Sequence, residues 1–169
     1  MPVSRINRVR CCSLLLAIGL LFGWPVCADA QIITEFPLPS SVNNIPVGTP
    51  RGIVVGSDDA LWFTAGKIIG RITTAGAITA FSLPDAGGAP DAITAGPGDA
   101  LWFTTTTGVG RITTGGVFTG FPFFNDDLVP EQGGITAGPD GALWFARDAG
   151  VGRITTSGTV TGFDTPNTA

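Results

Sequence analysis

The chain has 169 residues, of which nine are basic and thirteen acidic, so its net charge is −4, and it contains neither histidine nor tyrosine. A weakly acidic chain of this kind is a poor partner for nucleic acid or for an anionic membrane surface. All three cysteines lie within the first 30 residues, so general acid–base chemistry in the remainder would fall to aspartate and glutamate.

Residues 1–30 have the pattern of a signal peptide. Three arginines within the first ten residues form a basic start, and Leu14 to Phe22 is an uncharged apolar run. That run is shorter than the roughly 20 residues that a membrane-spanning helix needs. Ala28-Asp29-Ala30 has the small residues that a signal peptidase accepts. The segment predicts cleavage after Ala30 and a secreted or periplasmic protein; a lipid anchor on Cys27 is the alternative.

Removal of this segment changes the composition that matters for folding. Residues 31–169 contain no cysteine and therefore no disulfide, and their six basic and twelve acidic residues give a net charge of −6. These 139 residues are enough for one modest domain. They include no second long apolar run, so we expect no membrane contact after cleavage.

The first predicted strand of this domain covers residues 32–39. Its Ile33, Thr34 and Phe36 recur as Ile78, Thr79 and Phe81 and, more loosely, as Val160, Thr161 and Phe163. Those later positions lie at the ends of longer repeats. The segment therefore corresponds to the end of a repeat whose other strands do not precede it, and we interpret it as an orphan outer strand.

Three copies of Ala-Leu-Trp-Phe follow, each succeeded within a few residues by Gly-Arg-Ile-Thr-Thr. The copies begin at Ala60, Ala100 and Ala142, which are 40 and 42 residues apart. A repeat of about 40 to 45 residues with strand-like content is typical of β-propeller blades.

Each repeat is predicted to form four short strands. They cover 52–56, 60–65, 68–74 and 77–83 in the first repeat, 93–95, 101–105, 109–114 and 117–122 in the second, and 135–137, 143–147, 151–156 and 159–163 in the third. Gly-Pro-Gly-Asp at 96–99 and Gly-Pro-Asp-Gly at 138–141 are turn signals, because these residues tolerate positive φ. No helical periodicity follows residue 30. The blades are predicted at about 50–84, 90–123 and 132–165.

Side chains alternate along a strand, so the Leu and Phe of each Leu-Trp-Phe should share one face of the sheet and the Trp should occupy the other. Burying a Leu or Phe contributes about 1.5–3 kcal/mol, whereas ordering each residue costs about 1–2 kcal/mol of backbone entropy. One blade cannot be stable alone, but stacked blades can.

The sequence therefore predicts an all-β fold, namely a partial β-propeller of three four-stranded antiparallel blades plus the orphan N-terminal strand. Propellers usually close with about four to eight blades. Three blades would be part of a ring, or a subunit that a partner completes. A homo-oligomer of two copies would close a six-bladed ring, with the strand at 32–39 added to the partner's sheet edge.

The sequence of the repeat resembles that of the streptogramin (virginiamycin B) lyase family. Residues 138–145, 70–74 and 33–39 carry the resemblance, which extends over essentially all of 31–169. It implies a seven-bladed propeller that opens a cyclic depsipeptide antibiotic by elimination, with a histidine general base, neighbouring acidic residues and a magnesium ion. This chain has no histidine. Where such blades often carry an acidic residue, it has Ala65, Thr105 and Arg147.

No catalytic residue and no metal ligand is therefore assigned, and magnesium is expected only if the chain is a lyase. Residues that recur once per blade are predicted to be structural; these are Arg71, Arg111 and Arg153, Trp62, Trp102 and Trp144, and the turn residues Asp58, Asp99 and Asp140. A binding site is more often made of residues that break the repeat; these are Arg51, Asp91, Arg147, Asp148, Asp126, Asp127 and Glu131.

Arg51 and Asp91 occupy matching positions before the innermost strands, near the mouth of a propeller's central channel, and are the predicted ligand contacts. The cluster of Asp126, Asp127 and Glu131 is a weaker candidate, for a hard cation. We expect an exported, non-catalytic propeller segment that acts as a recognition or scaffold module for an unknown ligand. The alternative is a truncated lyase of the virginiamycin B type; lactone hydrolysis with bound calcium and a gene fragment without function also remain open.

Overall fold

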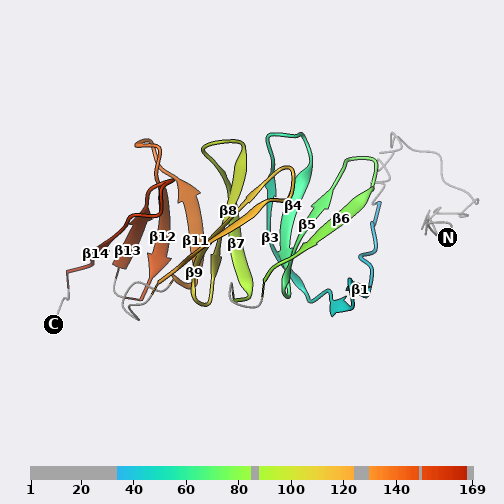
Figure 1. The fold of residues 1–169 in the computed structure, drawn as a ribbon, viewed down its shortest axis with the longest axis horizontal. Helices are drawn as coiled ribbons and strands as arrows, with labels where there is room; N and C mark the ends of the chain where they lie inside the picture. The colour runs from blue at the N-terminus through green and yellow to red at the C-terminus, as the bar shows by residue number, and fades with distance from the viewer. Residues whose placement is uncertain (1–33, 85–87, 124–129, 149, 167–169) are drawn as a thin grey trace, which may run out of the picture. The chain divides into compact units, whose positions relative to one another are not determined.

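In the computed structural model of the chain, the described residues are 34–84, 88–123, 130–148 and 150–166 (Figure 1). The chain divides into two units, Met1–Pro37 and Leu38–Ala169, and every strand of the described residues belongs to the second. These residues form no helix, and no membrane-spanning helix is found among them.

Three four-stranded antiparallel sheets follow one another along the chain, each a simple meander. The first contains β3 (Pro50–Val55), β4 (Leu61–Ala65), β5 (Ile68–Ile72) and β6 (Ile78–Ser82). The second contains β7 (Pro90–Gly96), β8 (Ala100–Thr105), β9 (Gly108–Thr113) and β10 (Phe118–Pro122). The third contains β11 (Pro130–Ala137), β12 (Leu143–Arg147), β13 (Gly150–Ile154) and β14 (Val160–Asp164).

The first strand of each sheet lies against the first strand of the next, so that β3 contacts β7 and β7 contacts β11 (Figure 1). This is the arrangement of propeller blades, whose first strands are innermost. The predicted all-β class and the three four-stranded antiparallel blades are confirmed.

The N-terminal segment differs in detail from its prediction. Residues 34–39 have no strand pairing, and residues 32 and 33 lie outside the described part. A short hairpin follows instead, formed by β1 (Ser41–Val42) and β2 (Ile45–Pro46), with Asn43 and Asn44 at φ of 49° and 64° in its turn. Successive positive φ values are typical of a type I′ hairpin turn.

Leu38 nevertheless packs in the same way as the residue at the matching position of the first repeat. It lies against the cluster of Phe63, Ala65 and Ile68 on the first sheet. Leu83, at the matching position, belongs to the same buried cluster as Phe103 of the second sheet. In both cases the leucine covers part of the following blade.

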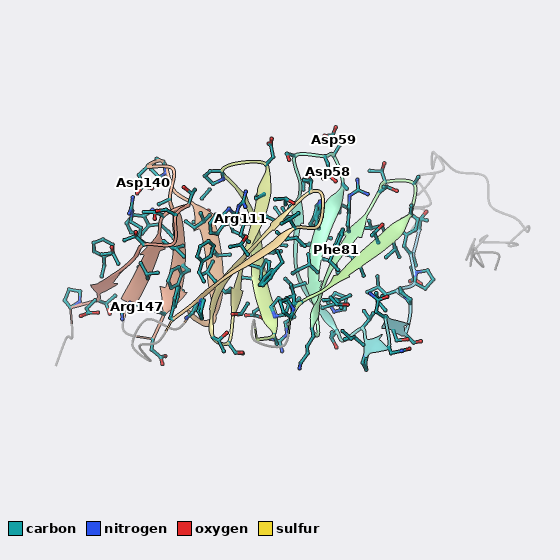
Figure 2. The ribbon with its side chains drawn as sticks, in the orientation of Figure 1. Asp58, Asp59, Phe81, Arg111, Asp140 and Arg147 are labelled. Carbon is teal, nitrogen blue, oxygen red and sulfur yellow. The ribbon has the colours of Figure 1, made fainter. Side chains whose placement is uncertain are left out.

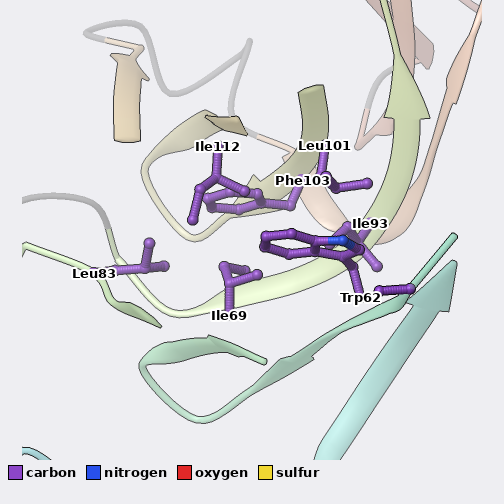
Figure 3. Packing of buried hydrophobic residues seen from close by; sticks show 8 residues of the cluster. Trp62, Ile69, Leu83, Ile93, Leu101, Phe103 and Ile112 are labelled. Atoms are coloured by element: carbon purple, nitrogen blue, oxygen red, sulfur yellow. The ribbon is translucent and has the colours of Figure 1, made fainter. Parts of the chain in front are cut away.

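Two buried clusters join the three sheets, and they confirm the alternation of Leu-Trp-Phe. Leu101 and Phe103 of the second sheet lie in a cluster with Trp62 of the first (Figure 3). Trp102, between them in sequence, points to the other face and lies with Leu143 and Phe145 of the third sheet. Each of these six side chains is at most 1% exposed.

The glycine before each repeated arginine lies beneath an aromatic ring. Phe63 pairs directly with Gly70 across β4 and β5, and Phe103 pairs in the same way with Gly110. A Cβ atom at either glycine would overlap the ring of its partner. Neither glycine has positive φ, so backbone conformation does not require glycine at these positions. The space that the aromatic ring occupies does.

We predict that Gly110→Ala lowers the free energy of unfolding by about 1–3 kcal/mol, because the added methyl group displaces the Phe103 ring from a closely packed core. Urea unfolding of the two proteins measures the difference. Gly115→Ala is the matched control, since its Cβ atom would meet nothing nearer than Thr113 Oγ1 at 3.7 Å. Equal effects of the two substitutions would contradict this explanation of the repeat.

Candidate functional site

The structure brings the two predicted ligand contacts, Arg51 and Asp91, together in an ion pair. Arg51 on β3 and Asp91 on β7 approach to 2.9 Å between Nη1 and Oδ1. The Arg51 side chain is 54% exposed and that of Asp91 is 22% exposed. The pair joins the innermost strands of the first two sheets, so a ligand that used either side chain would have to compete with the other.

A buried hydroxyl beside this pair also connects the two sheets, and sequence analysis did not identify it. Thr64 Oγ1 donates to the carbonyl oxygen of Asp91 at 2.5 Å and accepts from the amide of Gly52 at 2.9 Å. The residue is fully buried. Its signal was the threonine that follows Leu-Trp-Phe in the first two repeats; Ala146 stands at that position in the third.

Repeated carboxylates at the opposite end of the strands form the best-ordered polar contacts. Asp58 Oδ1 accepts from Trp62 Nε1 at 2.9 Å, and its Oδ2 accepts from Arg71 Nε at 2.6 Å. Partial burial of Asp58 acts to raise the pKa of its carboxyl, but the hydrogen bonds from Trp62 and Arg71 outweigh it and the pKa is lowered. We name this arrangement the Trp-Asp-Arg triad.

The third sheet contains the same triad. Asp140 accepts from Trp144 Nε1 at 3.0 Å and from Arg153 Nε at 2.6 Å. The hydrogen bonds from Trp144 and Arg153 lower the pKa of Asp140 from 3.8 to about 2. Asp58 and Asp140 lie at the same end of their sheets, and Arg147 lies at the other end of the third (Figure 2). Two of the three repeated arginines therefore pair with a turn carboxylate, as a structural role requires.

The second sheet lacks the carboxylate of the triad. Four residues before Trp102 stands Gly98, and Asp99 corresponds instead to Asp59 of the first repeat. In the described part of the chain, the buried Nε1 of Trp102 has no hydrogen-bond partner. Arg111 Nη2 donates to the carbonyl oxygen of Gly98 at 3.4 Å, and its guanidinium lies 6.0 Å from the centre of the Trp102 ring.

The turn of the second sheet shows why Asp99 does not replace the missing carboxylate. Gly98 and Asp99 have φ of 75° and 49°, two successive positive values. In the third sheet only the second turn residue, Gly141, has positive φ, at 72°. The order Gly-Asp therefore gives a different turn from the order Asp-Gly.

Other candidate chemistry finds little support in the described residues. Arg147, which breaks the repeat, is buried and forms an ion pair with Asp164 at the end of β14. A cavity of about 20 Å³ lies against Thr105, Val109 and Phe121, and that volume admits one water molecule at most.

The proposed cation cluster cannot be compared with the structure. Asp126 and Asp127 lie outside the described residues, and the side chain of Glu131 is not described either. Elsewhere in the described part, no group of three or more His, Cys, Asp or Glu residues is placed to hold a metal ion. The cation hypothesis for residues 126–131 stays a prediction.

Three consecutive four-stranded meanders are packed face to face, with their first strands innermost. This is the arrangement of blades in a β-propeller, which is the class of protein that the fold defines. The chain belongs to the virginiamycin B lyase family, whose sequence model matches residues 28–169. No curated protein matches the sequence.

Two solved lyases are similar over most of this chain. The structure of a streptogramin B lyase is 38% identical, with a TM-score of 0.70, over 82% of this chain and 46% of its own. A catalytically inactive variant of virginiamycin B lyase from Staphylococcus aureus, solved with quinupristin, is 35% identical, with a TM-score of 0.70, over 84% of this chain and 48% of its own. The present chain thus spans about half the length of the lyases that it matches.

A more distant likeness extends to the fold alone. A gluconolactonase from Xanthomonas campestris is 19% identical over 82% of this chain and 54% of its own, with a TM-score of 0.58. At that identity the match shows only that the blade architecture is shared.

We predict that the double exchange Gly98→Asp with Asp99→Gly raises the free energy of unfolding by about 1 kcal/mol, because it supplies the buried Trp102 Nε1 with an acceptor and Arg111 with a carboxylate. The exchange leaves the net charge unchanged and copies the turn of the third sheet. Thermal unfolding measures the change. Asp99→Gly alone is the control, and a double variant no more stable than this control would contradict the explanation.

A second prediction concerns acid stability. The pKa of Asp140 is lower in the folded protein than in the unfolded chain, so its contribution is fully present above about pH 4 and is lost as the pH falls toward 2. Asp140→Asn should therefore lower the melting temperature at pH 7, and the difference from the unaltered protein should shrink between pH 4 and pH 2. Melting curves across this range test it; a constant difference would count against the triad as its cause.

Proposed function

We propose that the chain is an exported, non-catalytic propeller segment of the virginiamycin B lyase family that serves as a recognition or scaffold module. The observation that carries the proposal is the absence of any histidine from residues 1–169. The elimination expected of the family needs a group that removes a proton near neutral pH, and histidine is the side chain best suited to that step.

Four of the described carboxylates are held in structural contacts. Asp58 and Asp140 each accept hydrogen bonds from a tryptophan and an arginine, and their pKa values are lowered. A carboxylate with a lowered pKa is a weak base, so Asp58 and Asp140 are suited to structure rather than to proton transfer. Asp91 and Asp164 are engaged by their arginine partners.

For recognition, the exposed end of the Arg51–Asp91 pair is the proposed ligand contact. It lies on the innermost strands of two neighbouring blades, where propellers present residues to the mouth of the central channel. A ligand with its own hydrogen-bonding or charged groups would take the place of the half-exposed Arg51 side chain as a partner of Asp91. The nature of that ligand is open.

A lyase that acts only as part of a larger assembly is the second candidate. The 38% identity to a streptogramin B lyase structure favours it. Since the chain spans about half of that structure, a base and a magnesium site would have to come from elsewhere in the assembly. None of the residues described here is assigned to either role.

Export is proposed to depend on residues 1–30, by cleavage after Ala30. The basic start, the apolar run and the Ala-Asp-Ala sequence support this, and a lipid anchor on Cys27 is the alternative. Export would place the protein where extracellular small molecules are accessible.

The proposed function predicts that the protein, expressed from the full-length sequence and recovered from outside the cytoplasm, begins at Gln31 and leaves quinupristin intact in the presence of Mg²⁺. Mass spectrometry measures both the N-terminus and the ring-opened product. The Staphylococcus aureus virginiamycin B lyase serves as the positive control. Ring opening above the buffer rate that a chelator abolishes would show the non-catalytic assignment to be incorrect.

A further inference from the structure

One sheet face in the third blade is exposed, although the equivalent face is buried in the other two. In the first sheet Trp62 and Ile69 are fully buried, and in the second Trp102 and Val109 are at most 2% exposed. Their equivalents in the third are Trp144, which is half-buried, and Val151, which is 40% exposed. Phe163, which stacks on Trp144 at 5.4 Å, is 47% exposed. We name Trp144, Val151 and Phe163 the tryptophan face.

The first sheet is exposed over part of its opposite side; Leu38, Ile45 and Val47 pack against Phe63, Ala65 and Ile68 on the rest of it. Ile53 is 63% exposed, whereas its equivalents Ile93 and Ile135 are 8% exposed. Leu61 and Ile72 are half-buried, whereas the matching residues of the other two sheets are at most 1% exposed; these are Leu101, Ile112, Leu143 and Ile154. We name Ile53, Leu61 and Ile72 the leucine face.

The two faces are the two halves of a single kind of junction. Between the first and second sheets, Trp62 and Ile69 pack against Ile93, Leu101 and Ile112 (Figure 3). Between the second and third sheets, Trp102 and Val109 pack against Ile135, Leu143 and Ile154. Among the described residues this junction is therefore made twice, and two of its halves have no partner sheet, the tryptophan face of the third sheet and the leucine face of the first.

We propose that a second copy of this chain covers both faces. The tryptophan face of one copy packs on the leucine face of the other, and the reciprocal contact forms at the same time. The two copies together hold six blades, within the range of about four to eight at which propellers close. The two joined surfaces differ, so the contact is head-to-tail. Head-to-tail contacts give a ring when the rotation from copy to copy closes the circle, and an open filament when it does not.

A second copy fits these faces because its side chains match those that already cover the equivalent faces. Ile53, Leu61 and Ile72 repeat the types found at 93, 101 and 112 without change. Forming one junction holds the second pair of faces close together. Their effective concentration is then raised, which stabilises the dimer. The pairing does not depend on whether the ring binds a ligand.

The test is the assembly state of the protein expressed from the full-length sequence, measured by native mass spectrometry and by analytical ultracentrifugation over a range of concentrations. We expect a dimer. Ile53→Asp and Val151→Asp each place a charge in both junctions of the dimer and should weaken it by about 100-fold. Val117→Asp is the matched control, since Val117 is 64% exposed but lies in the second sheet's turn, away from both faces, and should leave the dimer unchanged.

Mixing the two weakened variants separates a head-to-tail pairing from its alternatives. The tryptophan face of the Ile53→Asp copy and the leucine face of the Val151→Asp copy are both intact, whereas the other junction of the mixed dimer carries both charges. The mixture should therefore dimerise through the intact junction at concentrations at which neither variant does so alone. Circular dichroism confirms folding, and if Val151→Asp does not fold, Phe163→Ser at another exposed position of the tryptophan face takes its place.

Several outcomes would overturn the proposal. A monomer at every concentration would mean that something other than a second copy, such as a further blade of a longer chain, covers the faces. A dimer that Ile53→Asp leaves intact would mean that identical faces pair, and filaments of indefinite length would mean that the ring does not close.

Discussion

The packing of a tryptophan-bearing face against a leucine-bearing face is the interaction on which the rest of this structure depends. A single meander of four short strands cannot bury enough apolar surface to offset its loss of conformational entropy. Trp62 and Trp102 are fully buried only because the next sheet covers them. Close packing also explains the glycines beneath Phe63 and Phe103, since a Cβ atom at either glycine would overlap the ring above it.

The polar residues of the repeat serve this packing. Each indole that lies in a junction has an N–H group, and a buried donor without a partner costs about 1–3 kcal/mol. In the first sheet, the turn aspartate satisfies the indole and its arginine together. The second sheet has exchanged the order of Gly and Asp, and there Trp102 remains without an acceptor in the described part of the chain. The fold tolerates this loss because Trp102 keeps its apolar contacts with Leu143 and Phe145 of the third sheet.

These structural contacts also limit which side chains are available for function. In the first and third sheets the recurring Trp, Arg and turn Asp are engaged with one another, which removes them from the groups available for chemistry. The residues that break the repeat are few, and two of them, Arg51 and Asp91, are paired across the first junction. Membership of a lyase family therefore describes the architecture of this chain, whereas an activity has to be argued from individual side chains.

The sequence by itself determined the all-β class, the number of blades and the alternation of Leu, Trp and Phe across each sheet, because these follow from a repeat of fixed length and from the two-residue period of a strand. It also separated structural arginines from candidate contacts. It did not show what the one-residue shift of Asp99 relative to Asp58 and Asp140 does, because the shift is visible in the sequence but the φ values of the turn are not. Nor did it show the Arg51–Asp91 pair, the bridging Thr64, or which faces stay exposed. Those depend on which strands of different repeats meet, and only the tertiary structure decides that.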